Sequence, residues 1–151
     1  MTGGCLCGAV RYECSGEPVF ALLCHCRDCQ RQSGSAYAAA VRLPAASFRV
    51  TQGAPKLYVK TADSGNQVSR AFCPECGCML FLRVSARPDL VGIRVGTLDD
   101  PAALPPDVHI YTRSKLPWVA LPQGIPAFEA YYDAKALWPA ASLERRRAAL
   151  D

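Results

Sequence analysis

Short runs in which apolar and polar residues alternate dominate this chain, and they predict strands. Alternation is typical of strands because successive side chains of an extended chain point to opposite faces of a sheet. Clusters of Gly, Pro, Asp and Ser separate the runs, as expected of turns. The predicted strands cover residues 10–13, 36–42, 47–51, 56–60, 67–72, 79–84, 91–95 and 108–111.

Helical periodicity is confined to the end of the chain. Twelve prolines and eleven glycines argue against long helices. The exception is residues 142–150, where Ser142 can cap a short helix. We find no internal repeat, low-complexity segment or linker in the 151 residues. The pattern therefore predicts one mainly β domain at residues 1–128, with the tail at 129–151 part of the same unit.

Composition and charge exclude some classes of protein. Half of the residues are hydrophobic and a fifth are charged, which is ordinary for a soluble globular protein. No apolar run approaches the ~20 residues that span a bilayer, so no membrane partner is expected. The net charge of +4 would tolerate an anionic ligand, but it predicts no nucleic-acid partner. We interpret the one basic run, residues 145–147, as a solvated helix face.

Nine cysteines fall into three clusters, and two of these predict a closed metal site. Cys73 and Cys76, followed by Gly77, have the spacing of a zinc knuckle. A knuckle supplies two ligands, whereas a structural zinc takes four. Cys5 and Cys7 are the natural second pair, because the middle cluster already has three cysteines.

The middle cluster predicts an open metal site. Cys24, Cys26 and Cys29 offer three thiolates within six residues. A catalytic zinc typically takes three protein ligands and keeps one position open. His25 is expected either to contact the site from behind the ligands or to lie exposed. The polar residues 30–37 suit a wall that a small polar ligand can reach, and a plain turn is the alternative.

Other uses of the cysteines fit the sequence less well. The chain starts without a charged and apolar leader, so we expect a cytoplasmic protein with reduced thiols rather than a disulfide framework. Buried structural cysteines or a redox Cys-x-x-Cys would not explain three clusters. Cys14 is expected to be a buried strand residue. A ligand role for Cys78, beside the knuckle, stays open.

These motifs identify a family resemblance. The chain resembles the glutathione-dependent formaldehyde-activating enzyme family, also called the GFA or centromere-protein-V family. The three cysteine motifs in this order are highly specific, and the resemblance extends to about residue 128. It departs at Cys78, where the family usually carries Ser or Thr. The matching segments are residues 3–12, 24–31, 33–35, 72–77, 96–101 and 109–118.

The resemblance implies a fold and a ligand set. The fold would be a zinc-stapled β fold similar to the Mss4-like fold, with a short C-terminal helix and two zinc ions per chain. Cys24, Cys26 and Cys29 would hold the catalytic zinc. The structural zinc would be held by Cys5, Cys7, Cys73 and Cys76.

The activity that the resemblance implies is that of a carbon–sulfur lyase. It would form or cleave an S-hydroxymethyl adduct, such as S-(hydroxymethyl)glutathione, from a small thiol and a small aldehyde. An open zinc suits this chemistry, because a free thiol titrates near ~8.5 and coordination deprotonates it. Arg27, Arg31 and Lys115 are candidates to meet substrate carboxylates, with ordinary surface charge as the alternative.

Two functions of other classes stay open. One is a non-enzymatic binding module in which both zincs only hold shape, and a fourth protein ligand at the second zinc would favour it. The other is a thiol redox or metal-handling protein, which would release zinc readily when its thiols oxidise. An exchangeable water or thiol at the second zinc would favour the enzyme.

Overall fold

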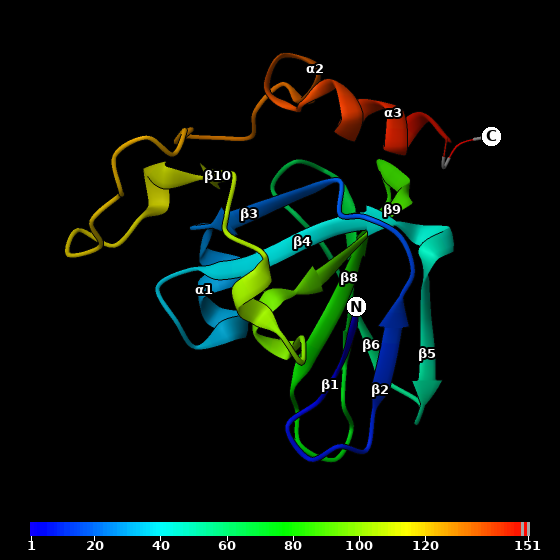
Figure 1. The fold of residues 1–151 in the computed structure, drawn as a ribbon. Helices are drawn as coiled ribbons and strands as arrows, with labels where there is room; N and C mark the ends of the chain where they lie inside the picture. Colours follow the sequence, from blue (N-terminus) through cyan, green and yellow to red (C-terminus); the bar gives the residue numbers. More distant parts are fainter. Residues whose placement is uncertain (149, 151) are drawn as a thin grey trace.

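Two β-sheets form the framework of the chain, which a computed structural model describes for residues 1–148 and 150 (Figure 1). Only β10 and β3 pair in parallel, and the other described strand pairs are antiparallel. The smaller sheet has the order β1 (Thr2–Gly4), β2 (Arg11–Cys14), β5 (Phe48–Gln52). The larger sheet has the order β10 (Val108–Ile110), β3 (Phe20–Cys24), β4 (Ala38–Pro44), β9 (Arg87–Arg94), β8 (Met79–Val84), β7 (Gln67–Phe72), β6 (Lys56–Thr61).

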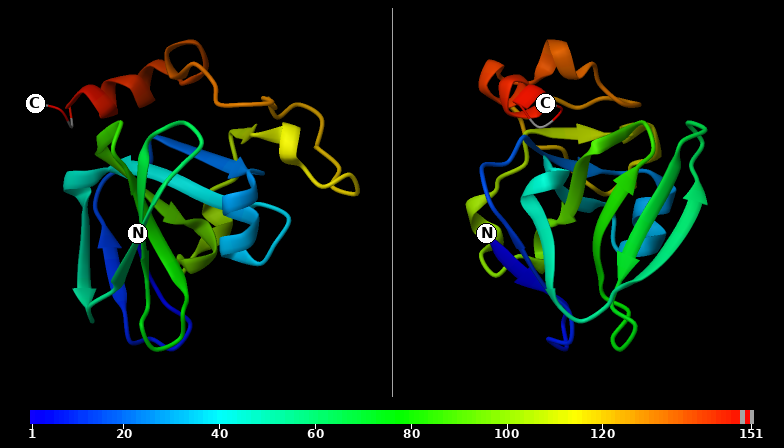
Figure 2. Two further views of the ribbon diagram at one scale, coloured as in Figure 1. Left: turned by 180° about the vertical axis from the view of Figure 1, so that it is seen from behind. Right: turned by 90° about the vertical axis from the view of Figure 1, so that its right-hand side faces the viewer.

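The helices are short and lie around these sheets. Among the described residues the longest α-helix has nine residues, far fewer than a bilayer requires. Figures 1 and 2 show α2 and α3 lying together beside β3 and β9, away from the smaller sheet. The α-helices are α1 (Arg27–Ser33), α2 (Ala134–Leu137) and α3 (Ala140–Ala148). The 3-10 helices are η1 (Ala45–Ser47), η2 (Val95–Thr97), η3 (Pro101–Ala103) and η4 (Thr112–Ser114).

The register gives the larger sheet two different faces. Val41 lies opposite Ile93, which in turn lies opposite Phe81, and this row packs against the smaller sheet to form the first core. The other face carries Ala40, whose register partners are Leu22 on β3 and Arg94 on β9. This second face therefore combines apolar side chains with a charged one, and the candidate site lies on it.

The C-terminal tail packs over one end of this second face. Tyr132 and Trp138 are buried against Phe20, and the Trp138 indole N–H donates to the Tyr132 hydroxyl over 2.9 Å. The Arg146 guanidinium pairs with the buried Asp89 carboxylate at 2.7 Å. The interpretation of residues 145–147 as a solvated face is therefore wrong for Arg146, which fastens α3 to β9.

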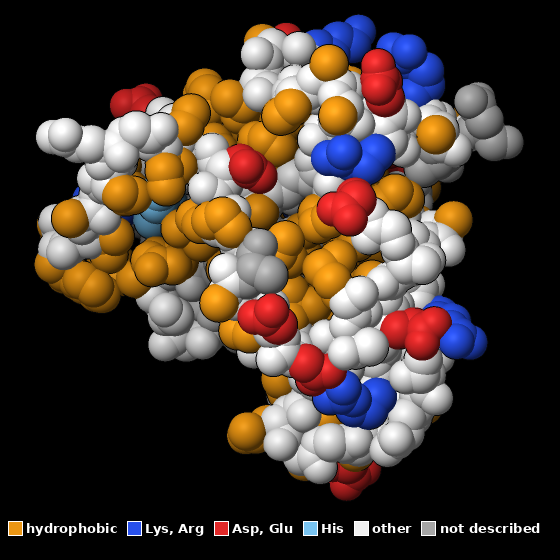
Figure 3. Space-filling view, in the orientation of Figure 1, with side chains coloured by type: hydrophobic (Ala, Val, Ile, Leu, Met, Phe, Trp, Pro, Cys, Tyr) orange, Lys and Arg blue, Asp and Glu red, His pale blue; other side chains and the backbone are white. Residues whose placement is uncertain are grey.

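Charges on the face seen in Figure 3 are interleaved rather than segregated. Lys and Arg side chains lie beside Asp and Glu side chains across the surface in view. Arg11 pairs with Asp99, and Arg49 pairs with Glu13, each at 2.5 Å. Both pairs are exposed, so each contributes little to stability.

The mainly β fold predicted from the sequence is confirmed, with corrections to individual elements. The strand predicted at residues 91–95 begins at Arg87, and the strands β1 and β3 were not predicted. The helix α1 was not predicted either. The C-terminal helix begins at Ala140, so Ser142 is buried inside it and is not its N-cap. The predicted extent to residue 150 includes residue 149, which lies outside the described residues.

Candidate metal centre

Four cysteine sulfurs from two distant loops converge at one end of the first core. The sulfurs of Cys5, Cys7, Cys73 and Cys76, here called the four-thiol site, all lie within 4.8 Å of one another. The Cys5 and Cys7 sulfurs are 3.5 Å apart, and those of Cys7 and Cys73 are 3.8 Å apart. Tetrahedral coordination with Zn–S bonds of about 2.3 Å requires sulfurs about 3.8 Å apart. The site could therefore hold a metal ion, and its dimensions are compatible with zinc.

Glycine shapes both turns that present these sulfurs. Gly8 and Gly77 have left-handed backbones, with φ of 78° and 71°. Their amides donate to the carbonyl oxygens of Cys5 and Cys73 over 3.1 and 2.9 Å. A residue with a side chain adopts this conformation only at a cost, so glycine keeps each pair of sulfurs pointing to one centre.

The electrostatics of the four-thiol site favour a cation. Burial acts to raise the pKa of Cys5, but the Val10 amide and the neighbouring thiols donate to its sulfur and lower the pKa to about 6. The Ala9 amide acts to lower the pKa of Cys7, yet the Cys5 thiolate retains the Cys7 proton and raises that pKa to about 12. Without a metal the set holds thiolates and protonated thiols together. A divalent cation would neutralise the thiolates and displace those protons.

The two remaining cysteines lie outside this group. Cys14 is a buried residue of β2, as expected from the sequence. Cys78 is half-buried beside the knuckle, and it is not among the four converging sulfurs. Its sulfur lies 4.0 Å from the Met79 carbonyl oxygen.

A second group of three sulfurs is built where β3 ends and α1 begins. The sulfurs of Cys24, Cys26 and Cys29, here called the triad, lie within 4.8 Å of one another. Cys24 is the last residue of β3, and Cys26 is the N-cap of α1. The Cys29 amide donates to the Cys26 sulfur over 3.4 Å. The first turn of α1 thus folds the triad together, and a helix start also favours thiolates.

Buried polar side chains hold α1 and the triad in place. The Gln30 side-chain amide donates to the carbonyl oxygens of His25 and Ser114 over 2.7 and 2.8 Å. The His25 ring is fully buried, and its Nε2 lies 2.9 Å from Nδ1 of His109. Burial lowers the pKa of both rings, so they are neutral imidazoles at pH 7. The sequence-based option of an exposed His25 is therefore wrong.

When no metal is present, the triad holds one thiolate, Cys29, and two protonated thiols, Cys24 and Cys26. The thiols of Cys24 and Cys26 donate to the Cys29 sulfur and lower the pKa of Cys29, and the Arg94 guanidinium adds to this effect. The pKa of Cys24 is raised because its proton is shared with the other two sulfurs, and burial raises it further. Such a donor set suits a divalent cation, which would hold three thiolates at once.

A cavity of about 380 Å³ opens onto the triad. No cysteine of the four-thiol site lines it. Its lining is strongly cationic, with arginines outnumbering aspartates by six to two. Asp28 is itself neutralised, because its carboxylate lies 2.5 Å from Lys60 Nζ and 3.7 Å from the Arg70 guanidinium. The lining arginines are Arg27, Arg42, Arg70, Arg87, Arg94 and Arg113.

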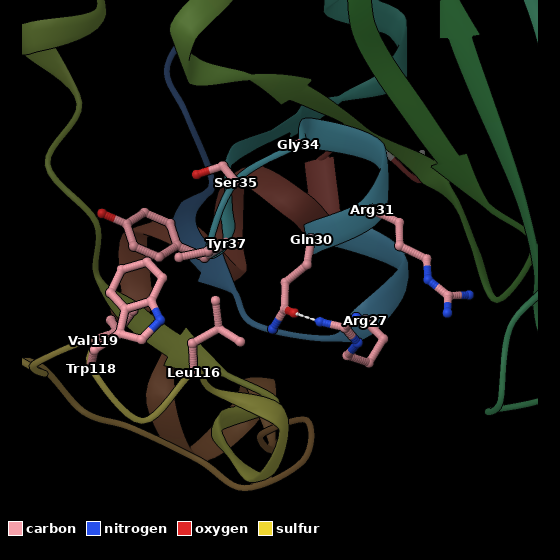
Figure 4. A pocket seen from close by; sticks show the side chains of 10 residues that line it. Arg27, Gln30, Arg31, Gly34, Ser35, Tyr37, Leu116, Trp118 and Val119 are labelled. Carbon is pink, nitrogen blue, oxygen red and sulfur yellow. Dashed lines mark hydrogen bonds between the residues drawn. The ribbon is translucent and has the colours of Figure 1, made fainter.

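Of the three cationic residues selected from the sequence, only Arg27 lines this cavity. Arg31 borders a second hollow, which also includes Tyr37 and Trp118 (Figure 4). The figure shows Arg31 extending away from these two rings. Lys115 donates from Nζ to the carbonyl oxygens of residues 116 and 119, over 3.1 and 2.7 Å. Residues 30–37 form the rest of α1 and the border of the second hollow, rather than a wall of the triad cavity.

The cavity residues that the sequence reasoning missed lie mainly on strands. Arg42, Arg70 and Arg94 project from β4, β7 and β9 on the same face of the larger sheet. The alternation of side chains along a strand was the available signal. Arg42 lies on the same face of β4 as the buried Ala38 and Ala40. A charged residue at a position facing the core indicates a site rather than a surface.

Tyr111 is a further cavity residue that the sequence reasoning did not select. It lines the cavity and has a left-handed backbone, with φ of 56°. For a bulky side chain this conformation is strained, and such strain is concentrated at functional sites. Burial raises the pKa of its hydroxyl, and the nearby sulfurs of Cys24 and Cys26 raise it further. Tyr111 therefore offers the cavity a neutral hydroxyl beside the triad.

Comparisons with known proteins agree with these observations. The model of a family described as "Glutathione-dependent formaldehyde-activating enzyme" matches residues 1–114. A Halomonas elongata protein, named "Putative glutathione-dependent formaldehyde-activating enzyme", is 29% identical over 126 residues, which are 80% of each chain. A Rhodobacter sphaeroides crystal structure is similar with a TM-score of 0.54 and 27% identity, over 68% of this chain and 94% of that one. The chain therefore belongs to the glutathione-dependent formaldehyde-activating enzyme (GFA) family.

Proposed function

We propose that the protein is a zinc-dependent carbon–sulfur lyase that forms or cleaves the S-hydroxymethyl adduct of a thiol such as glutathione. The observation that carries the proposal is the difference between the two sulfur groups. The four-thiol site can close a coordination shell by itself, whereas the triad has three sulfurs and lines a cavity. We assign a structural zinc to the former and a catalytic zinc, with one position left for substrate, to the latter.

The proposed reaction balances without an oxidant or a further reactant. In the forward direction a bond forms between the thiol sulfur and the aldehyde carbon, and the carbonyl π bond breaks. The thiol loses its proton, and the oxygen gains one to become the hydroxyl of the adduct. A bound zinc supplies the positive charge that keeps a thiol deprotonated and can polarise the aldehyde oxygen.

The residues of the cavity have separate parts in this proposal. The triad holds the metal, and α1, fastened by Gln30, keeps its sulfurs in place. The arginines attract an anionic thiol and keep it beside the triad, which replaces a bimolecular encounter by a local one. The Tyr111 hydroxyl, kept protonated by its raised pKa, can donate a hydrogen bond to the oxygen of the adduct. We also place the protein in the cytoplasm, because ligand thiolates are lost when they oxidise to disulfides.

The test is an exchange measurement on labelled formaldehyde and glutathione at equilibrium, followed by carbon-13 exchange spectroscopy. The adduct forms spontaneously, so the rate of exchange is the informative quantity. We expect the zinc-loaded protein to accelerate exchange, and Cys26→Ser to abolish the acceleration with the loss of one zinc per chain. Cys78→Ser is the matched control, because Cys78 is a half-buried thiol outside both groups of converging sulfurs.

Two outcomes would overturn the assignment. Full acceleration by Cys26→Ser would remove the triad from the reaction. Absence of acceleration by protein that carries two zincs would exclude this pair of substrates and favour a non-enzymatic binding module.

A further inference from the structure

We propose that the triad cavity holds a carboxylate-binding subsite centred on Arg42, and that this residue selects thiols that also carry a carboxylate. The inference rests on the proposed function for the identity of the sulfur-containing ligand. It adds the residue that selects among thiols, which neither the sequence motifs nor the family relationship assigns.

The space for the Arg42 guanidinium is provided by a glycine on the neighbouring strand. Arg42 on β4 lies opposite Gly92 on β9, on the face of the sheet that lines the cavity. A β-carbon added to Gly92 would lie 2.3 Å from Nη1 of Arg42 and 3.1 Å from its Cζ. The guanidinium therefore lies over the Gly92 backbone, where a larger residue would displace it.

This guanidinium lacks the polar partners that Arg70 and Arg94 have in the same cavity. Arg70 has Asp28 at 3.7 Å, and Arg94 donates to the Gln32 side-chain oxygen over 2.9 Å. Within the described part of the chain, Arg42 forms no side-chain hydrogen bond or ion pair, and its Nε is buried without an acceptor. Buried donors are nearly always paired, and a planar guanidinium is suited to a carboxylate. An anionic ligand would supply the missing acceptor.

Arg42 and the triad lie at separate positions along the direction of β4. Arg42 lies four residues along β4 from Ala38, the register partner of Cys24. At about 3.3 Å per strand residue, the two positions are about 13 Å apart. An anionic group bound at Arg42 would therefore lie apart from a sulfur bound at the triad, so the subsite can contact a second part of the same thiol.

The experiment compares glutathione with its diethyl ester, in which both carboxylates are masked. For wild type we expect the ester to have a KM about tenfold or more above that of glutathione, which is the effect of losing a charge-assisted contact. Arg42→Gln should raise the KM for glutathione by a similar factor, change kcat little, and no longer distinguish the two thiols. Arg42→Lys should restore part of the discrimination. Gly92→Ala, which displaces the guanidinium, should resemble Arg42→Gln.

Arg83→Gln is the matched control, since Arg83 is exposed and lies on the opposite face of the same sheet. It should leave the KM values unchanged. If the role of Arg42 were purely structural, Arg42→Gln would alter the stability of the protein and would change the KM for both thiols by the same factor. The proposal is overturned if wild type does not distinguish the two thiols, or if Arg42→Gln distinguishes them as wild type does. Should Arg42→Gln fail to fold, the wild-type KM values for the two thiols and those of Arg42→Lys still decide whether the subsite exists.

Failure of the proposed function can be told apart from failure of the subsite. If zinc-loaded wild type accelerates exchange with neither thiol, the lyase assignment falls, and calorimetric binding of the same two compounds then tests the subsite. Binding of glutathione that is weakened about tenfold by esterification and by Arg42→Gln would support the subsite alone. Equal binding of both compounds, or no binding of either, would overturn it.

Discussion

Replacing Cys73 by serine should unfold the protein, because the four-thiol site joins the two ends of a long loop. Cys7 and Cys73 are 66 residues apart in the chain. Freeing a loop of this length in the loop-entropy estimate costs about 15 cal/mol/K, or about 4 kcal/mol at 25 °C. A domain of this size is typically stable by about 5–15 kcal/mol, so the loss is a large part of the total. The serine hydroxyl at a fully buried position adds to the cost.

The assay is urea unfolding followed by circular dichroism, with zinc counted in the same samples. Cys14→Ser is the control for the cost of a buried hydroxyl, because Cys14 is buried in the same core and lies outside the sulfur cluster. We expect Cys14→Ser to lose about 1–3 kcal/mol and to keep both zincs. Cys73→Ser should lose one zinc, and it should either be unfolded or have a free energy of unfolding well below that of Cys14→Ser. A soluble Cys73→Ser protein with two zincs and a wild-type midpoint would refute the loop-closure reasoning.

Two further predictions concern the triad and the C-terminal helix. At pH 7 the metal-free triad holds two protons, so zinc should expel two protons from it, measured by calorimetry in buffers of different ionisation enthalpy. Its zinc affinity should accordingly fall about hundredfold for each unit of decreasing pH, and a pH-independent affinity would contradict the charge assignment. Asp89→Asn should cost about 1–3 kcal/mol and speed proteolysis of the tail, because Asp89 is buried and pairs with the partly exposed Arg146. Glu13→Gln, in the exposed pair with Arg49, should change stability by less than about 1 kcal/mol.

A strand is easiest to locate in the sequence where one of its sides is buried and the other is not. The strand at 67–72 is half-buried, so its alternating pattern locates it at both ends. β3 was missed because its side chains are mostly buried on both faces, which removes the alternation. β1 was missed because it is short and has two glycines, and Gly3 lies against the Tyr12 ring where a side chain would collide.

The two cysteine groups could be read from spacing, whereas the cavity beside the triad could not. Ligands within a few residues of one another are brought together by a local turn or by the start of a helix, as at Cys26 and Cys29. The cavity instead depends on the register of strands far apart in the chain, which brings Arg42 and Arg70 to one face. Arg31 and Lys115 were selected from the sequence, and the fold directs their charges elsewhere. The cysteine groups are therefore predictable from the sequence here, whereas the lining of the cavity depends on how the strands pair.

The arginines also bear on how the proposed tris-thiolate site would accept an anionic substrate. Three thiolates around a divalent cation carry a net charge of −1, which would repel a thiolate with further carboxylates. Arg94 is buried and already favours the thiolate form of Cys29, so part of the surplus charge is offset at the triad itself. Arg70 is partly offset by Asp28, whereas Arg42 retains its charge for a ligand. Substituting Arg94 should thus weaken the triad's hold on a metal, while substituting Arg42 should weaken only the hold on substrate, and zinc titration beside thiol binding would separate the two roles.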